Sequence, residues 1–211
     1  MRGLSKPPYF IITLHWVDAL TLGSLALAGL GLLAALHGRL SLAIALMLLA
    51  MVADMFDGVL ARRFNQATEF GRYLDSFCDV FTYLALPLFV LYQFGMRDAL
   101  SLTALFAFLA SGLLRLSRFN VIGTVEEAGV HYHLGLPVIW SHLLVVLAFP
   151  LWWWLGDPAR YIIAGALGVM SVCMIRNLRF RKPTRYALLT IIILSVAAVY
   201  FYLHSLGIDA P

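Results

Sequence analysis

The sequence predicts an all-α bundle of about six to seven transmembrane helices, forming a single membrane domain over residues 1–211. Of the 211 residues, 62% are hydrophobic and only 12% are charged, whereas an ordinary soluble domain has about 25% charged residues. A mean hydropathy of +0.89 means more apolar side chains than a core of this size can bury, so lipid must face most of them. Any chemistry must therefore be built from the spans and their short loops.

Seven uncharged stretches mark the expected helices. They run over residues 19–36, 40–53, 80–96, 99–114, 134–156, 161–175 and 186–208. A helix needs about 20 residues to cross a hydrocarbon core of roughly 30 Å, so the shorter stretches must include charged residues at their ends. The second stretch must continue through Asp54 and Asp57 towards Arg62. Before the first stretch, the aromatic segment Pro8–Trp16 is typical of a short segment lying in the membrane interface.

The distribution of basic residues predicts the orientation. If the N-terminus lies inside, twelve of the fifteen Lys and Arg residues lie at inner span ends, and three, Arg39, Arg97 and Arg160, lie at outer ends. Cytoplasmic loops carry the excess of basic residues, so we expect a cytoplasmic N-terminus. The net charge of +4 then reflects arginines at the cytoplasmic face and not a nucleic-acid partner. Anionic lipid headgroups or phosphates are the natural partners of these arginines.

Four of the eleven acidic residues fall within 26 residues of each other: Asp54, Asp57, Asp75 and Asp79. The i, i+3 and i, i+4 spacings place each pair on one helix face. Like charges gathered at membrane depth are costly, so they predict bound cations. Ligands that are all oxygen suit Mg²⁺ or Mn²⁺, and two pairs could hold two ions.

Two other readings of the aspartates are open at this point. A salt-bridge cluster with neighbouring arginines would also gather acidic residues. A non-enzymatic cation transporter could use the aspartates as a permeation site. Transport would need a polar path to the outer side, and the outer halves of the second and third spans offer none.

The residues that follow Asp57 indicate a phosphate ligand. Gly58 has no side chain and Ala61 lies one turn beyond Asp57, so a ligand could approach the backbone on that face. Arg62 supplies a guanidinium that can bind two phosphate oxygens at once. Carboxylates, divalent cations and an arginine together suit pyrophosphate chemistry.

The run from Asp54 to Asp79 reads D-x2-D-G-x2-A-R-x8-G-x3-D-x3-D. It resembles the signature of the CDP-alcohol phosphatidyltransferases at all eight fixed positions. The resemblance implies homodimeric enzymes of the bacterial inner membrane, with the active site facing the cytoplasm, that use two divalent cations, Mg²⁺ or Mn²⁺. They displace CMP from a CDP-linked lipid with an alcohol hydroxyl. It assigns metal binding to Asp54, Asp57, Asp75 and Asp79, contacts with the CDP part to Asp57, Gly58, Ala61, Arg62 and Gly71, and the general base to Asp79.

Within this family the chain looks nearest to the phosphatidylserine synthases. The stretches that carry this likeness are residues 56–80, 112–120 and 135–137, and more weakly 174–183. The resemblance implies that L-serine accepts the phosphatidyl group of CDP-diacylglycerol. Arg115 and Arg118 are candidates for binding the acceptor carboxylate or a lipid phosphate, although positive-inside anchoring would explain them equally well.

Two other stretches, residues 82–87 and 137–140, are similar instead to phosphatidylcholine synthases. With choline as acceptor, Tyr83, Trp140 and Tyr132 could surround the quaternary ammonium through cation–π contacts. Each of these aromatic residues could otherwise be a core or interfacial residue. His131 and His133 fall in an expected inner loop, near enough to contact the acceptor or the nucleotide.

Overall fold

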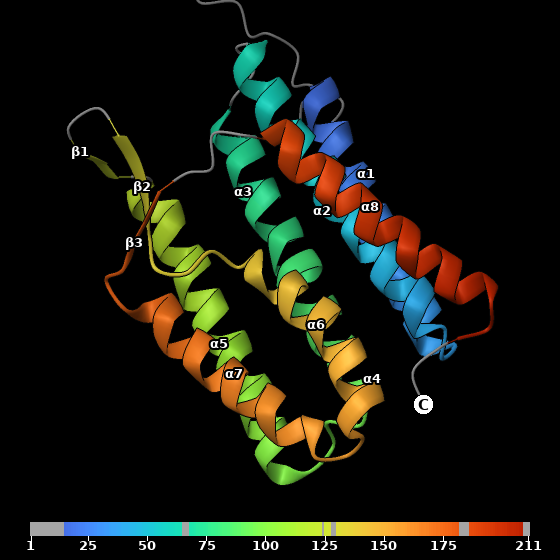
Figure 1. Cartoon of the computed structure of the whole chain (residues 1–211). Coiled ribbons are helices and arrows are strands. Elements are labelled where there is room, and N and C mark those ends of the chain that lie inside the picture. The colour runs from blue at the N-terminus through green and yellow to red at the C-terminus, as the bar shows by residue number, and fades with distance from the viewer. Residues whose placement is uncertain (1–14, 65–67, 124, 128–129, 182–185, 209–211) are drawn as a thin grey trace, which may run out of the picture.

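The computed structural model describes residues 15–64, 68–123, 125–127, 130–181 and 186–208 (Figure 1). The helices in this part of the chain are α1 (Trp16–Leu36), α2 (Leu40–Arg63), α3 (Glu69–Asp79), α4 (Leu86–Gln93), α5 (Ala99–Ile122), α6 (Trp140–Leu155), α7 (Ala159–Ile175) and α8 (Tyr186–Ser205). A π-helix, η1 (Val80–Ala85), joins α3 to α4, so Glu69–Gln93 is one continuous helix. The predicted interfacial segment, Pro8–Trp16, lies outside the described residues as far as residue 14.

The predicted helical membrane bundle is confirmed. Within the described residues, four helices are long and apolar enough to cross a membrane, Trp16–Leu36, Leu40–Ala61, Glu69–Gln93 and Ala99–Ile122, and three shorter apolar helices accompany them. The second helix continues past both aspartates to Arg63, as its sequence requires. The third begins at Glu69, well before the uncharged stretch that starts at residue 80, because the polar turns of α3 continue the same helix.

Small residues bring the helices close together. On α2, Ala43, Ala45 and Ala50 are completely buried, and α2 packs between α1 and α8 (Figure 1). Gly112 on α5 lies against η1, where a Cβ atom would collide with the Leu84 side chain. Small residues at such contacts allow helix backbones to approach closely, which is how helices associate in lipid.

A small antiparallel sheet caps one end of the bundle, beside the C-terminal end of α5 (Figure 1). It consists of β1 (Val125–Glu127), β2 (Val130–Leu134) and β3 (Arg179–Arg181), in the order β1-β2-β3. The sequence prediction of loops here was wrong, because β2 finds a partner strand far along the chain. In β2 and β3, Leu134 pairs with Arg179.

Gly135 fixes this sheet against the end of α7. Its φ of +76° is in the region that favours glycine. A Cβ atom there would also collide with the Met174 carbonyl oxygen. The Gly135 N–H donates to the Leu178 carbonyl at 2.8 Å. The loop between β2 and α6 is thereby held against the C-terminal end of α7, and Leu134 and Met174 line a pocket with Arg115 and Arg118 of α5.

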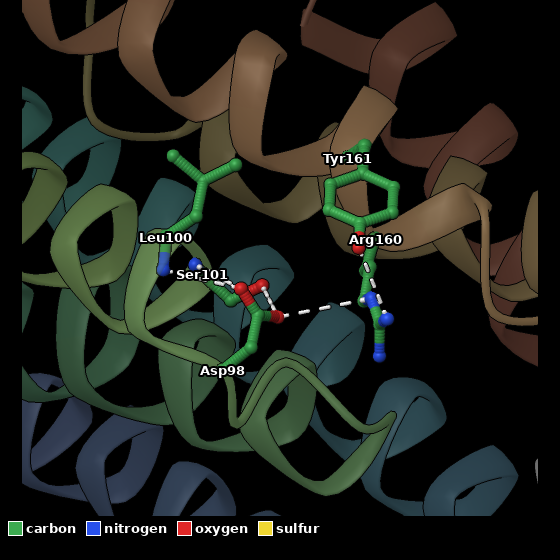
Figure 2. Close-up of polar contacts among 5 residues, drawn as sticks. All are labelled: Asp98, Leu100, Ser101, Arg160 and Tyr161. Carbon is green, nitrogen blue, oxygen red and sulfur yellow. Dashed lines mark hydrogen bonds and ion pairs between the residues drawn. The ribbon is translucent and has the colours of Figure 1, made fainter.

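At the opposite end of α5, Asp98 caps the helix and joins it to α7 (Figure 2). Its carboxylate accepts hydrogen bonds from the Leu100 and Ser101 N–H groups at 3.1 and 3.2 Å, and from the Ser101 hydroxyl at 2.6 Å. Arg160 lies 3.8 Å away and donates to the Tyr161 hydroxyl at 3.1 Å. The Ser101 hydrogen bonds hold the pKa of Asp98 below its ordinary value.

This cap should make stability depend on pH. Because the folded-state pKa of Asp98 is lowered, the ionised carboxylate stabilises the fold above its unfolded pKa of about 3.9, and this contribution is lost as the pH falls through the folded value. Asp98→Ala is expected to lower the thermal unfolding midpoint in detergent by about 2–4 °C at neutral pH. The difference in unfolding midpoint between Asp98→Ala and the wild type should become smaller below about pH 4. An equal difference at pH 3 and pH 7 would contradict this account.

Candidate active site

Three of the four predicted aspartates lie together. Asp54 and Asp57 come from α2 and Asp75 from α3, and one carboxylate oxygen of each lies within 4.8 Å of the others. Asp57 is only 3% exposed. Oxygens at these separations can reach a common divalent cation at about 2.0–2.6 Å. A donor set of carboxylate oxygens fits Mg²⁺ or Mn²⁺, as the sequence predicts.

Asp79, the last residue of α3, lies outside this close group of three. It is partly buried, and the charges of Asp54, Asp75 and Asp57, together with that of Arg115, act on it. The Ser76 hydroxyl donates to Asn120 Oδ1 at 3.0 Å, which ties α3 to α5, the helix that carries Arg115. The charges of the three other aspartates and of Arg115 on α5 therefore both contribute to the electrostatic environment of Asp79.

Tyr83 contacts the aspartate group directly. Its hydroxyl donates to Asp54 Oδ2 at 2.7 Å, and its ring packs against that of His142 with the centroids 4.7 Å apart. Tyr83 lies in η1, where the Leu86 N–H donates to the Phe81 carbonyl five residues back. Such π-turns are rare and often occur at functional sites.

A cavity of about 220 Å³ adjoins the aspartates. It brings together four residues of the predicted CDP site, Asp57, Gly58, Ala61 and Gly71. Arg62 is the fifth predicted CDP contact, and its side chain lies outside the described part of the structure. The remaining lining residues come from α1, α3, α5 and the N-cap of α3: Val17, Asp18, Thr21, Thr68, Arg72, Asp75 and Phe119.

Asp18 of α1 is a cavity residue that the sequence analysis missed. It is 5% exposed, and its Oδ2 accepts the His15 N–H at 2.8 Å. Its Oδ1 lies 3.2 Å from where a Cβ of Gly71 would be, so Gly71 lets α3 begin close to α1. The signal was a carboxylate directly before an apolar span. Hydropathy alone does not mark it, because the uncharged stretch begins one residue later.

A second cavity, of about 120 Å³, contains Arg115 and Arg118 of α5. Phe119 lines both cavities, so the two are neighbours. The buried Arg115 Nε has no hydrogen-bond acceptor among the residues that the structure describes. The other lining residues are Leu114, Ile122, Gly123, Leu134, Met174 and Ile175.

Two of the three aromatic candidates for a choline site, Tyr83 and Trp140, have different neighbours. Tyr83 is buried against His142. Trp140 is 43% exposed and lines an apolar groove with residues that include Leu143 and Met170. The side chains of Tyr132, His131 and His133 lie outside the described part of the chain, although their backbone belongs to β2.

Comparison with known proteins gives a family match. Residues 14–175 match the family model described as CDP-alcohol phosphatidyltransferase. Over 171 residues, 80% of this chain and 90% of the relative, the chain is 30% identical to the CDP-diacylglycerol–serine O-phosphatidyltransferase of Bacillus subtilis. It is 34% identical over 116 residues to the protein of the same name from Methanocaldococcus jannaschii, covering 55% of this chain and 52% of that one. A phosphatidylcholine synthase from Mesorhizobium japonicum is 27% identical over 175 residues, 80% of this chain and 61% of the relative.

Proposed function

Because the chain belongs to the CDP-alcohol phosphatidyltransferase family, we propose that it transfers the phosphatidyl group of CDP-diacylglycerol to the hydroxyl of L-serine, giving phosphatidylserine and CMP. Membership of this enzyme family decides against the transport alternative. The observation that supports serine most directly is the cavity with Arg115 and Arg118 next to the one that holds the predicted CDP contacts. A serine carboxylate is a natural partner for a guanidinium.

In this proposal the four aspartates have different roles. Asp54, Asp57 and Asp75 hold the divalent cations, with Asp79 as the predicted fourth ligand. Bound cations would neutralise the pyrophosphate and the charge that develops on it during displacement. Gly58, Ala61 and Gly71 leave room for the nucleotide in the larger cavity, and Arg62 is expected to bind its phosphates.

Asp79 acts on the acceptor in this mechanism. Its carboxylate takes the proton of the serine hydroxyl, and the oxygen then forms a bond to the phosphorus that carries diacylglycerol. The bond from that phosphorus to the oxygen bridging it to CMP breaks, and CMP leaves with the electron pair. Arg115, on which the charge of Asp79 acts, holds the serine carboxylate so that the hydroxyl faces Asp79.

Choline is the second candidate acceptor. One relative named a phosphatidylcholine synthase covers as much of this chain as the Bacillus protein, and residues 82–87 and 137–140 are similar to that group. A trimethylammonium would gain about 0.5–2 kcal/mol from aromatic faces. However, Tyr83 and Trp140 have separate neighbours, and a choline site would have little use for two arginines.

An acceptor panel tests the proposal. Purified protein is given CDP-diacylglycerol and Mn²⁺ or Mg²⁺ with serine, choline, inositol phosphate or glycerol 3-phosphate in turn, and CMP release is measured. We expect release with serine alone, and none from a matched Asp75→Asn preparation, which controls for contaminating enzymes. Release with choline and none with serine would refute the serine assignment.

We also propose that the site faces the cytoplasm, because Arg72, Arg115 and Arg118, three of the basic residues expected at the inner span ends, line its two cavities. In sealed inverted vesicles, serine added outside should support CMP release without detergent. If CMP release from these vesicles required detergent, the site would face the opposite side of the membrane and the proposed orientation would be wrong.

A further inference from the structure

The hydroxyl of Tyr83 has a place in this site that the family signature does not cover. Tyr83 lies four residues beyond Asp79, the last fixed position of the signature. From the sequence, only its ring has a predicted role, as a possible face for choline. In the structure the hydroxyl donates to Asp54 Oδ2 at 2.7 Å, and the side chain is 3% exposed.

We propose that Tyr83 is a positioning residue of the metal site. Its hydroxyl holds the Asp54 carboxylate in the orientation that binds a divalent cation, and the His142 ring holds Tyr83. This proposal rests on the proposed function, because it takes Asp54, Asp57 and Asp75 as metal ligands.

The repulsion within the aspartate group explains why Asp54 needs such a partner. Its carboxylate must stay beside those of Asp57 and Asp75, whose oxygens lie within 4.8 Å. Before a cation binds, like charges at this separation favour side-chain orientations that point apart. A donor on Oδ2 resists that rotation and leaves Oδ1 available to the cation. Hydrogen bonds of this kind to metal ligands commonly account for about 10- to 100-fold in metal affinity.

Tyr83 is itself held firmly enough to do this. It lies buried within the wide turn of η1, and its ring contacts that of His142 at 4.7 Å with the planes inclined by 46°. His142 comes from α6 and is 1% exposed. Its Nδ1 lies within hydrogen-bond distance of the Ser141 hydroxyl, at 3.2 Å. One hydrogen bond and one ring contact therefore connect the metal site to α6.

A buried tyrosine needs an acceptor for its hydroxyl wherever it lies, so a purely structural role must be separated from positioning. The chain offers a matched control in Tyr200. It is 5% exposed, its hydroxyl donates to the Val146 carbonyl at 2.8 Å, and its ring contacts Phe149 at 5.4 Å. Tyr200→Phe removes an equivalent hydrogen bond whose acceptor is a backbone carbonyl and not an aspartate.

The experiment compares wild type, Tyr83→Phe and Tyr200→Phe as full chains in detergent. Mn²⁺ affinity is measured by calorimetry without lipid substrate, and the rise of the thermal midpoint with Mn²⁺ gives a second readout of binding. We expect Tyr83→Phe to bind Mn²⁺ about 10-fold more weakly, with CMP release recovering at high Mn²⁺. Tyr200→Phe should retain wild-type Mn²⁺ affinity even if its midpoint without metal falls.

Wild-type Mn²⁺ affinity in Tyr83→Phe would overturn the positioning role, and CMP release by the wild type would still support the proposed function. An equal loss of affinity in both variants would also overturn it, because the effect would then be general destabilisation. Absence of Mn²⁺ binding and of CMP release in the wild type would instead overturn the proposed function, and the positioning role with it.

Discussion

Asp79→Asn is expected to slow CMP release by about 10²- to 10⁴-fold, the usual contribution of a general base. Binding of CDP-diacylglycerol should be largely retained. The two quantities are measured separately, by single-turnover CMP release at saturating serine and by equilibrium binding of the CDP-lipid.

The physical reason is that asparagine has nearly the shape of aspartate but an amide cannot accept the serine proton. Asp79 lies outside the close group of Asp54, Asp57 and Asp75, so that group stays intact in the variant. The loss should therefore fall on kcat, the signature of an interaction needed in the transition state.

Glu69→Gln is the matched control. It removes an acidic group from the same helix, but the Glu69 side chain is 77% exposed and is not among the residues lining the cavity beside the aspartates. Glu69→Gln should leave both CMP release and CDP-lipid binding unchanged. Near-wild-type turnover of Asp79→Asn would contradict the base assignment, and a parallel loss of CDP-lipid binding would make Asp79 chiefly a ligand of the cations.

The sequence was sufficient to predict what depends on composition and spacing along one helix. Hydropathy predicts the helices because lipid permits only a few ways to satisfy the backbone. The i, i+3 spacing of Asp54 and Asp57 predicts a shared face, and the length needed to cross the membrane predicts that α2 continues past them. The gathering of Asp75 with this pair was expected because the four aspartates fall within 26 residues, at the ends of two consecutive spans.

Other features depend on contacts between distant segments. Leu134 pairs with Arg179 in the sheet, and neither short strand indicates its partner. The i to i+5 bond from Leu86 to Phe81 changes the angular position of residues relative to a regular 3.6-residue helix. A regular helical repeat therefore does not predict that the hydroxyl of Tyr83 meets Asp54.

Arg115→Ala is expected to raise the KM for serine by about 10- to 100-fold, because a hydrogen bond to a charged group contributes about 1.5–3 kcal/mol. Arg115 Nε is buried without an acceptor among the described residues, which suits a carboxylate arriving with the substrate. The KM for CDP-diacylglycerol should change little. Arg115→Lys should recover only part of the loss, since an ammonium cannot form the paired contacts of a guanidinium.

Trp140→Leu separates this account from the choline alternative. Serine and choline require opposite electrostatics, since only serine brings a carboxylate and only choline brings a trimethylammonium. Trp140 lines an apolar groove that shares no lining residue with the arginine cavity, so a serine enzyme should tolerate Trp140→Leu, whereas a choline enzyme should lose affinity for its acceptor. Changes at Tyr83 would not discriminate, because its hydroxyl contacts Asp54. An unchanged serine KM in Arg115→Ala, together with impaired turnover in Trp140→Leu, would favour choline and leave the family and the aspartate site standing.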